Sequence, residues 1–217
     1  MIDKGDIMIK RFIWDFDGTI VDGDFSIEEN LFRDNLSEED FLKFNEKWYE
    51  LLNVYEKEFP KYDRKMLSEF LSTNTGVTIS EKLIDEWSKY MINVNETIHP
   101  GAVAVLDYLQ NKGYENIIYT NAFTNTQVGR IKKLGFSSYF KEIIGAEEFI
   151  KPTTEGFIKA CGPHKPNECV MIGDNYNKDI LGALKAGLNV IYYCPKGLPK
   201  EVDVPHVKKL IKIKEMY

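Results

Sequence analysis

Hydrophobic residues are distributed in two different ways along the chain. Five short runs are almost entirely apolar and cover residues 7–14, 116–119, 142–145, 169–172 and 189–193. Runs of this kind are typical of parallel strands that are buried on both faces of a sheet. Between several of them, apolar residues recur every three or four positions and are followed by glycine, which indicates helices. The pattern predicts an α/β fold with an open, doubly wound parallel sheet, a Rossmann-like core.

The stretch from about residue 24 to residue 97 has no strand-like run and is rich in helical patterns. An apolar stripe from Phe41 to Phe59 predicts one long helix, and a second stripe covers residues 83–91. Acidic residues outnumber basic ones here, whereas the rest of the chain is nearly balanced. We therefore expect a small helical domain over 23–97, inserted into an α/β core made of 1–22 and 98–217.

Composition narrows the function classes. The chain has 217 residues, of which 43% are hydrophobic, which excludes a disordered protein. Its net charge of −6 argues against a nucleic-acid partner. We see neither an apolar run that could span a membrane nor a secretory signal at the N-terminus. Three scattered cysteines without metal-site spacing favour the reducing cytoplasm; they are Cys161, Cys169 and Cys194.

The first apolar run ends in two carboxylates and a glycine, namely Asp15, Asp17 and Gly18. In an open parallel sheet, ligands bind beyond the carboxyl ends of the strands, so both aspartates should emerge at the candidate site. Two close carboxylates repel each other and favour either a shared proton or a divalent cation. A polar turn would be the structural alternative for this segment.

The ends of the other runs carry complementary groups. Thr120 and Asn121 follow the second run, Lys151 lies past the third, and Asp174 and Asp179 follow the fourth. Carboxylate oxygens suit a hard ion such as Mg²⁺, which bridges to phosphate, and lysine supplies a positive charge for the phosphate. The set therefore indicates a site for an oxyanion next to a hard cation.

These segments resemble the four motifs of the haloacid dehalogenase superfamily, in its phosphatase branch, which includes phosphoglycolate phosphatases and β-phosphoglucomutase-like enzymes. The motifs occur in family order as DFDGT at 15–19, TN at 120–121, KP at 151–152 with EGF at 155–157, and GDNYNKD at 173–179. The resemblance covers about 1–22 and 98–195. Residues 23–97 lie where this branch inserts a helical cap.

The resemblance implies a role for each acidic motif residue. Asp15 would be the nucleophile and would form an aspartyl-phosphate intermediate. Asp17 would act as general acid and then as general base. Asp15, the main-chain carbonyl of Asp17, and Asp174 would hold Mg²⁺.

The remaining motif residues would position the phosphate. The resemblance implies that Thr120, the main-chain amide of Asn121, and Lys151 hold the phosphoryl oxygens, and Lys151 also counts among the catalytic residues. Asp179 would orient Lys151 or a metal-bound water. Gly18 would let the chain turn close to the site.

The expected function is Mg²⁺-dependent hydrolysis of a small phosphate monoester. A phosphomutase of the same fold is the alternative, because the core motifs do not decide whether water or a substrate hydroxyl attacks. A receiver-like or non-catalytic phosphate-binding protein is more remote, since the order of the motifs and their intact residues do not favour it. The family's dehalogenases lack an acid–base carboxylate two residues after the nucleophile, and Asp17 is present.

The expected partner is a small phosphorylated metabolite, with no nucleic acid or membrane, and a monomer is the default state. The helical stretch carries cations that could reach a second acidic group of the substrate, although solvated charges are the more ordinary interpretation. These cations are Arg33, Lys43, Lys47, Arg64 and Lys65.

Overall fold

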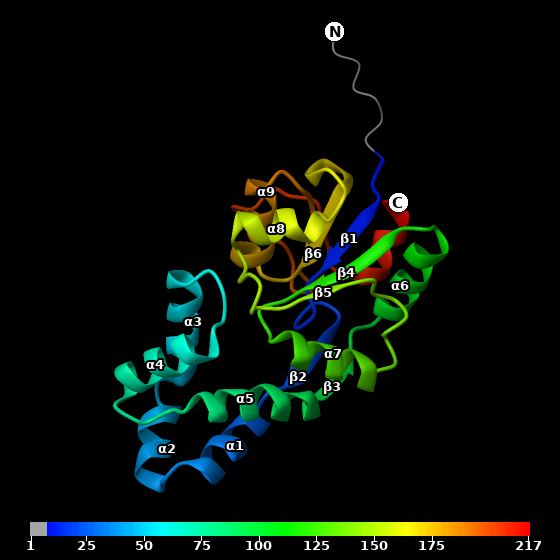
Figure 1. The fold of residues 1–217 in the computed structure, drawn as a ribbon. Helices are drawn as coiled ribbons and strands as arrows, with labels where there is room; N and C mark the ends of the chain where they lie inside the picture. The colour runs from blue at the N-terminus through cyan, green and yellow to red at the C-terminus, as the bar shows by residue number, and fades with distance from the viewer. Residues whose placement is uncertain (1–7) are drawn as a thin grey trace.

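The computed structural model describes residues 8–217 of the chain, and residues 1–7, with the start of the first apolar run, lie outside the described part. Within residues 8–217, six parallel strands form one sheet in the order β5-β4-β1-β6-β7-β8 (Figure 1). The strands are β1 (Arg11–Trp14), β4 (Glu115–Tyr119), β5 (Ile143–Ile144), β6 (Cys169–Gly173), β7 (Asn189–Tyr193) and β8 (His206–Val207). The five predicted strands are confirmed, and the short β8 is added to them.

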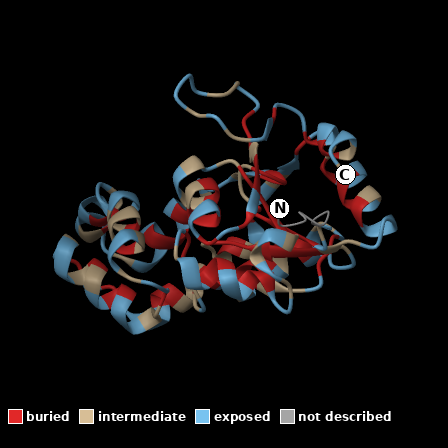
Figure 2. Cartoon of the chain, turned by 90° about the horizontal axis from the view of Figure 1, so that it is seen from above, coloured by how far each residue is buried: buried red, intermediate tan, exposed pale blue. Residues whose placement is uncertain are grey.

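Helices cover both faces of this sheet. Alternate residues of β1 point to opposite faces, so Phe12 and Trp14 join one hydrophobic cluster and Ile13 joins another. The first face is covered by α6 (Ala102–Asn111), α7 (Thr124–Lys133) and η4 (Leu210–Glu215). The second face is covered by α8 (Thr154–Cys161), the π-helical segment η3 (Tyr176–Leu181) and α9 (Gly182–Lys185), and the short η2 (Pro166–Glu168) leads into β6. The strands are accordingly buried between helices with exposed outer faces (Figure 2), which confirms the doubly wound fold.

Residues 25–94 contain five α-helices, which lie beyond the carboxyl ends of the strands of the sheet (Figure 1). They are α1 (Ile27–Asn35), α2 (Glu38–Asn45), α3 (Trp48–Glu58), α4 (Arg64–Thr75) and α5 (Glu81–Tyr90), followed by the short η1 (Met91–Asn93). They share a hydrophobic core that is rich in aromatic rings and that also includes Phe123, Ala146 and Ile150 from the segments after β4 and β5.

The prediction of one long helix from Phe41 to Phe59 is wrong. The chain leaves the helical conformation at Lys47, where φ is −123°, and α2 and α3 form instead. A straight helix would spread the apolar stripe along its axis. With the break, Phe44 and Trp48 stack on each other at 5.9 Å between ring centroids, and both contact Phe32.

Two short strands connect the helical region to the sheet. Strand β2 (Val21–Asp24) leads into it and β3 (Asn95–Ile98) leads out of it. They pair antiparallel, with Val21 opposite Ile98 and Asp24 opposite Asn95. The expected boundaries at residues 23 and 97 therefore fall inside this two-stranded ribbon. No helix among residues 8–217 is both long enough and apolar enough to cross a membrane.

Candidate active site

A pocket of about 340 Å³ lies between the carboxyl ends of the strands and the helical region. Seven side chains that the sequence singled out line it: Asp15, Asp17, Thr120, Asn121, Lys151, Asp174 and Asp179. They come from segments that follow β1, β4, β5 and β6, whose carboxyl ends meet at one edge of the sheet. The structure thus brings the predicted residues together, and their roles stay predictions.

Lys151 links two of the carboxylates. Its Nζ lies 2.5 Å from Oδ1 of Asp15 and 2.7 Å from Oδ1 of Asp179. The other oxygen of Asp15 accepts a hydrogen bond from the Thr19 hydroxyl at 3.1 Å. Burial opposes a charged lysine, but the negative charges of Asp15 and Asp179 outweigh it and raise the pKa of Lys151. The ammonium group therefore stays charged at neutral pH beside Asp15.

Thr120 and Asn121 follow β4 directly. The Thr120 hydroxyl oxygen accepts a hydrogen bond from the amide of Ala122, and the structure records no acceptor for its own hydrogen within residues 8–217. Asn121 makes two hydrogen bonds to the main chain of Lys151, at 2.7 Å through Oδ1 and 3.3 Å through Nδ2. The sequence assigned only the main-chain amide of Asn121 to the site, and its side chain in fact fixes the loop that carries Lys151.

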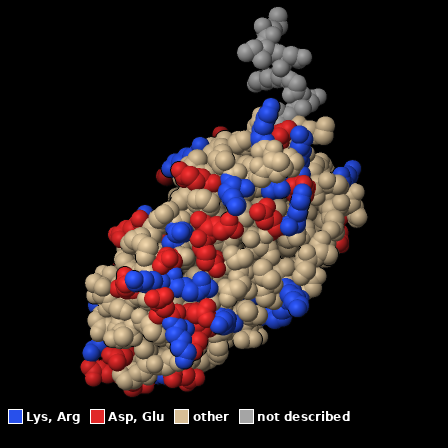
Figure 3. Space-filling model, viewed as in Figure 1, with Lys and Arg blue, Asp and Glu red and all other residues tan. Residues whose placement is uncertain are grey.

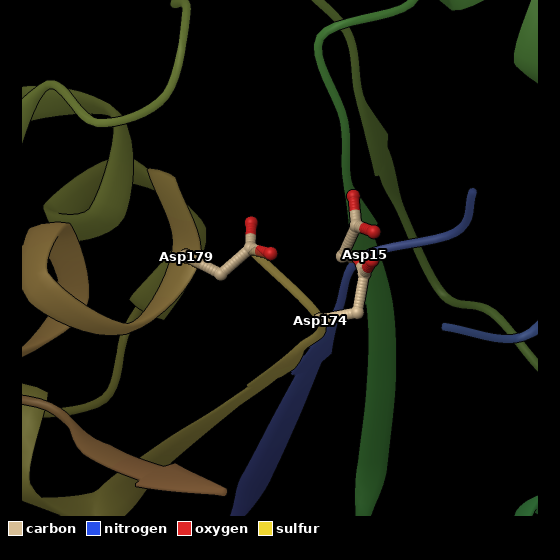
Figure 4. A group of neighbouring side chains, drawn as sticks. All are labelled: Asp15, Asp174 and Asp179. Carbon is tan, nitrogen blue, oxygen red and sulfur yellow. The ribbon is translucent and has the colours of Figure 1, made fainter. Parts of the chain in front are cut away.

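Asp15, Asp174 and Asp179 bring carboxylate oxygens within 4.8 Å of one another (Figure 4). Both oxygens of Asp179 are used, one by Lys151 and the other by the amide of Asn175. Among residues 8–217, the one hydrogen-bond donor to the Asp174 side chain is the Thr19 hydroxyl, at a long distance of 3.3 Å. Asp15, like Asp179, accepts a hydrogen bond at each oxygen, from Lys151 and from Thr19, so Asp174 is the most open of the three carboxylates to a cation.

Burial and the closeness of these carboxylates raise the pKa values of Asp174 and Asp179. Burial, followed by the charges of Asp15 and Asp179, raises the pKa of Asp174 to about 7. Burial also raises the pKa of Asp179 to about 6, against the opposing charge of Lys151. A hard divalent cation between Asp15 and Asp174 would relieve this repulsion, so the residues present fit Mg²⁺.

Asp17 contacts a residue that the sequence did not single out. Arg130 on α7 binds both of its oxygens, with Nη2 2.5 Å from Oδ1 and Nη1 2.9 Å from Oδ2. Arg130 is buried, and its Nε also donates to Glu96 on β3 at 3.0 Å. Burial raises the pKa of Asp17, and the Arg130 guanidinium counteracts part of that rise.

Gly18 turns the chain between these aspartates. Its φ of 81° lies in the left-handed region that favours glycine. A Cβ at this position would also overlap the carboxylate of Asp174. The glycine therefore lets the loop after β1 lie against the end of β6.

The helical region supplies the opposite wall of the pocket, which is largely aromatic. Trp87 contacts Trp48 and Phe123 edge to face, with ring centroids 5.6 and 5.7 Å apart. Glu28 on α1 lies in this wall, and burial raises its pKa to about 8. The buried Trp87 indole N–H lies close enough to Glu28 to counteract part of that rise in pKa, although it meets no acceptor at full hydrogen-bonding distance and angle among the described residues. The sequence did not single out Glu28 or Trp87 as candidate site residues.

Comparison with known families agrees with this geometry. The model of the haloacid dehalogenase-like hydrolases matches residues 9–187, and the chain belongs to that family. The membership that the four motifs predicted is confirmed.

Individual relatives share parts of the sequence. The chain is 33% identical over 114 residues to a glyceraldehyde 3-phosphate phosphatase of Methanothermobacter thermautotrophicus, covering 51% of this chain and 50% of that protein. A protein of the same name from Pyrococcus furiosus is 26% identical over 196 residues, covering 85% of this chain and 80% of that protein. The chain spans about half the length of several curated relatives that it matches.

Solved structures share the whole fold. A 2-haloacid dehalogenase from Pseudomonas syringae superposes with a TM-score of 0.68 at 26% identity, covering 96% of this chain and 97% of that one. The HAD-hydrolase YfnB from Bacillus subtilis gives a TM-score of 0.70 at 22% identity, covering 96% and 98% of the two chains. These likenesses include the helical region as well as the sheet.

Proposed function

We propose that this protein hydrolyses a small phosphate monoester through an aspartyl-phosphate formed on Asp15. The carrying observation is that Asp15 lies against the ammonium of Lys151 in a pocket that also holds a second carboxylate, Asp17. Curated relatives named as phosphatases support the same reaction class.

In the first step, a carboxylate oxygen of Asp15 attacks phosphorus and the bond from phosphorus to the alcohol oxygen breaks. Asp17 donates its proton to the leaving oxygen. In the second step, water attacks the phosphorus of the aspartyl-phosphate and gives a proton to Asp17, which releases inorganic phosphate and restores Asp15. Lys151, Thr120 and the amide of Asn121 neutralise and orient the phosphoryl oxygens throughout.

Mg²⁺ would be held by Asp15, Asp174 and the main-chain carbonyl of Asp17. When bound, it supplies positive charge to the phosphoryl oxygens. Asp179 would orient Lys151 and would not bind the metal directly. One of its oxygens contacts the ammonium group of Lys151, and the other accepts a hydrogen bond from the amide of Asn175.

Dehalogenation is the competing reaction within the family, and several structural relatives are named as dehalogenases. Asp17 argues for phosphoryl transfer, because an acid–base carboxylate is needed to protonate an alkoxide. We also propose that residues 23–97 act as a cap that excludes water from the pocket. The monomeric state and the cytoplasmic location expected from the sequence stay predictions.

The test is phosphate release from a panel of small phosphomonoesters, with Mg²⁺, with EDTA, and with the Asp15→Asn variant. We expect release that needs metal and is lost in the variant, together with trapping of phosphate on the wild-type protein. Release that persists in Asp15→Asn would contradict the nucleophile assignment. Transfer of phosphate to a second sugar hydroxyl, without net release, would favour the mutase alternative.

A further inference from the structure

Each cation in the lining of the pocket already contacts a carboxylate of the protein. Arg130 is shared by Asp17 and Glu96, and Lys151 by Asp15 and Asp179. The third cation, Lys178 on η3, forms an ion pair with Glu56 on α3. The described lining therefore offers no cation that lacks an acidic partner.

The cations that the sequence singled out in the helical region do not supply an unpaired positive charge to the pocket either. None of the five cations that the sequence raised as contacts for a second acidic group lines the pocket. Four of them pair with carboxylates elsewhere: Arg33 with Glu38, Lys43 with Glu39, Arg64 with Asp85, and Lys65 with Glu69. Acidic and basic side chains are likewise interspersed on the face shown in Figure 3.

A second acidic group of the substrate would therefore lie against this wall without a free cation to pair with. Burying a carboxylate or phosphate without a compensating charge is strongly unfavourable. Lys151 serves the transferred phosphate. The wall itself presents Glu28, whose carboxyl can donate or accept a hydrogen bond when protonated, and beside it the indole N–H of Trp87. These groups suit hydroxyl or amide groups on an uncharged alcohol.

We propose that the pocket selects phosphate monoesters whose alcohol part is polar but carries no second acidic group, and that the Glu56–Lys178 ion pair maintains this selectivity. The proposal rests on the proposed phosphatase function and names its substrate class. Diphosphates, phosphorylated carboxylic acids and other doubly acidic esters fall outside the class.

The ion pair gives a way to change the selectivity. Lys178 has one carboxylate partner, so Glu56→Gln would leave a free ammonium group in the wall of the pocket. Glutamine keeps an oxygen that can accept the hydrogen bond from the Tyr62 hydroxyl, which Glu56 accepts at 2.8 Å. Glu58→Gln is the matched control, since it makes the same charge change at an exposed position of the same helix outside the pocket.

The experiment compares glycerol 3-phosphate with 3-phosphoglycerate, which differ by an alcohol against a carboxylate on the same three-carbon skeleton. Each is measured as a substrate and as a competitor of p-nitrophenyl phosphate hydrolysis, in the full-length protein with Mg²⁺. We expect the wild type to favour glycerol 3-phosphate at least about tenfold in kcat/KM or in inhibition constant. Glu56→Gln should reduce that ratio about fivefold or more, and Glu58→Gln should leave it unchanged.

Equal values for the two compounds in the wild type would overturn the selectivity, and an unchanged ratio in Glu56→Gln would overturn the role of the ion pair. Hydrolysis of p-nitrophenyl phosphate separates these failures from failure of the proposed function. If p-nitrophenyl phosphate is hydrolysed, only the substrate class is in question. If no ester is hydrolysed and none binds, the proposed function itself is contradicted.

Discussion

Both oxygens of Asp17 accept hydrogen bonds from one guanidinium group, that of Arg130, while the Nε of the same group donates to Glu96. The planar fork of arginine matches a carboxylate with two parallel bonds, which fixes orientation as well as distance. Arg130 therefore holds the carboxylate of Asp17 and connects it to β3, the strand through which the chain leaves the helical region.

The Arg130→Gln variant should lose about 10- to 100-fold in kcat on phosphate esters of aliphatic alcohols, because a misplaced Asp17 delivers its proton poorly. The loss should be much smaller with p-nitrophenyl phosphate, whose leaving group needs little protonation. Steady-state kinetics on both substrates measures the difference. Arg33→Gln, at an exposed position of α1, is the control, and an equal loss on the two substrates would speak against positioning.

The stability of the protein should depend on pH through Glu28. Its pKa is about 8 in the folded chain and about 4.5 when unfolded, so the unfolded chain binds fewer protons between these values. The free energy of unfolding should therefore fall as the pH rises through this window, by on the order of 4 kcal/mol for this group. Glu28→Gln should remove that part of the slope.

Urea unfolding at pH 5, 7 and 9 measures the effect in the wild type and the variant. Glu29→Gln, the exposed neighbour of Glu28 on α1, serves as the control and should keep the wild-type slope. Parallel profiles for the wild type and Glu28→Gln would mean that Glu28 is not neutral in the folded protein.

Asp174→Asn should weaken metal activation. Of Asp15, Asp174 and Asp179, Asp174 is the carboxylate most open to a cation, and asparagine keeps the shape of the side chain without its charge. We expect the Mg²⁺ concentration for half-maximal activity to rise at least about tenfold, which corresponds to about 1.4 kcal/mol of binding free energy. Asp34→Asn on α1 should leave it unchanged, and an unaltered Mg²⁺ titration in Asp174→Asn would place the cation elsewhere.

Gly18→Ala should cost more stability than Gly76→Ala, and Gly18→Ala alone should also lower activity. Both glycines have positive φ, 81° and 72°, and alanine there costs about 1–2 kcal/mol. A Cβ at Gly76 would meet nothing within 4 Å, whereas one at Gly18 would displace the carboxylate of Asp174. Urea unfolding and Mg²⁺-dependent turnover of the two variants test this. Full activity in Gly18→Ala would contradict the close packing of the two loops.

The predicted site residues could be found from the sequence because each one follows a buried strand. Continuous apolar runs identify parallel strands, and parallel strands end at a common edge, so Asp15, Thr120, Lys151 and Asp174 had to meet. Their short motifs then gave the family. This inference used the order of the strands and motifs and did not depend on the number of residues between them.

Arg130 could not be found in the same way. It lies on the helix α7, 113 residues from Asp17 and 34 residues from Glu96 in sequence. Its helical pattern is that of an ordinary amphipathic helix, and only the packing of α7 against β3 buries its charge between two carboxylates. The break between α2 and α3 was missed for a related reason. A periodic apolar stripe indicates which residues are buried, but it does not show whether they belong to one continuous helix or to two.

The ribbon of β2 and β3 gives the helical region an entry and an exit that are hydrogen-bonded to each other. Strands β2 and β3 form a β-hairpin, and residues 25–94, with their five helices, are the connection between its two strands. The entropy of closing such a connection grows only with the logarithm of its length. Changes in the length of residues 25–94 should therefore cost the sheet little free energy, and the strand ends that lead to Asp15, Thr120 and Asp174 would keep their positions.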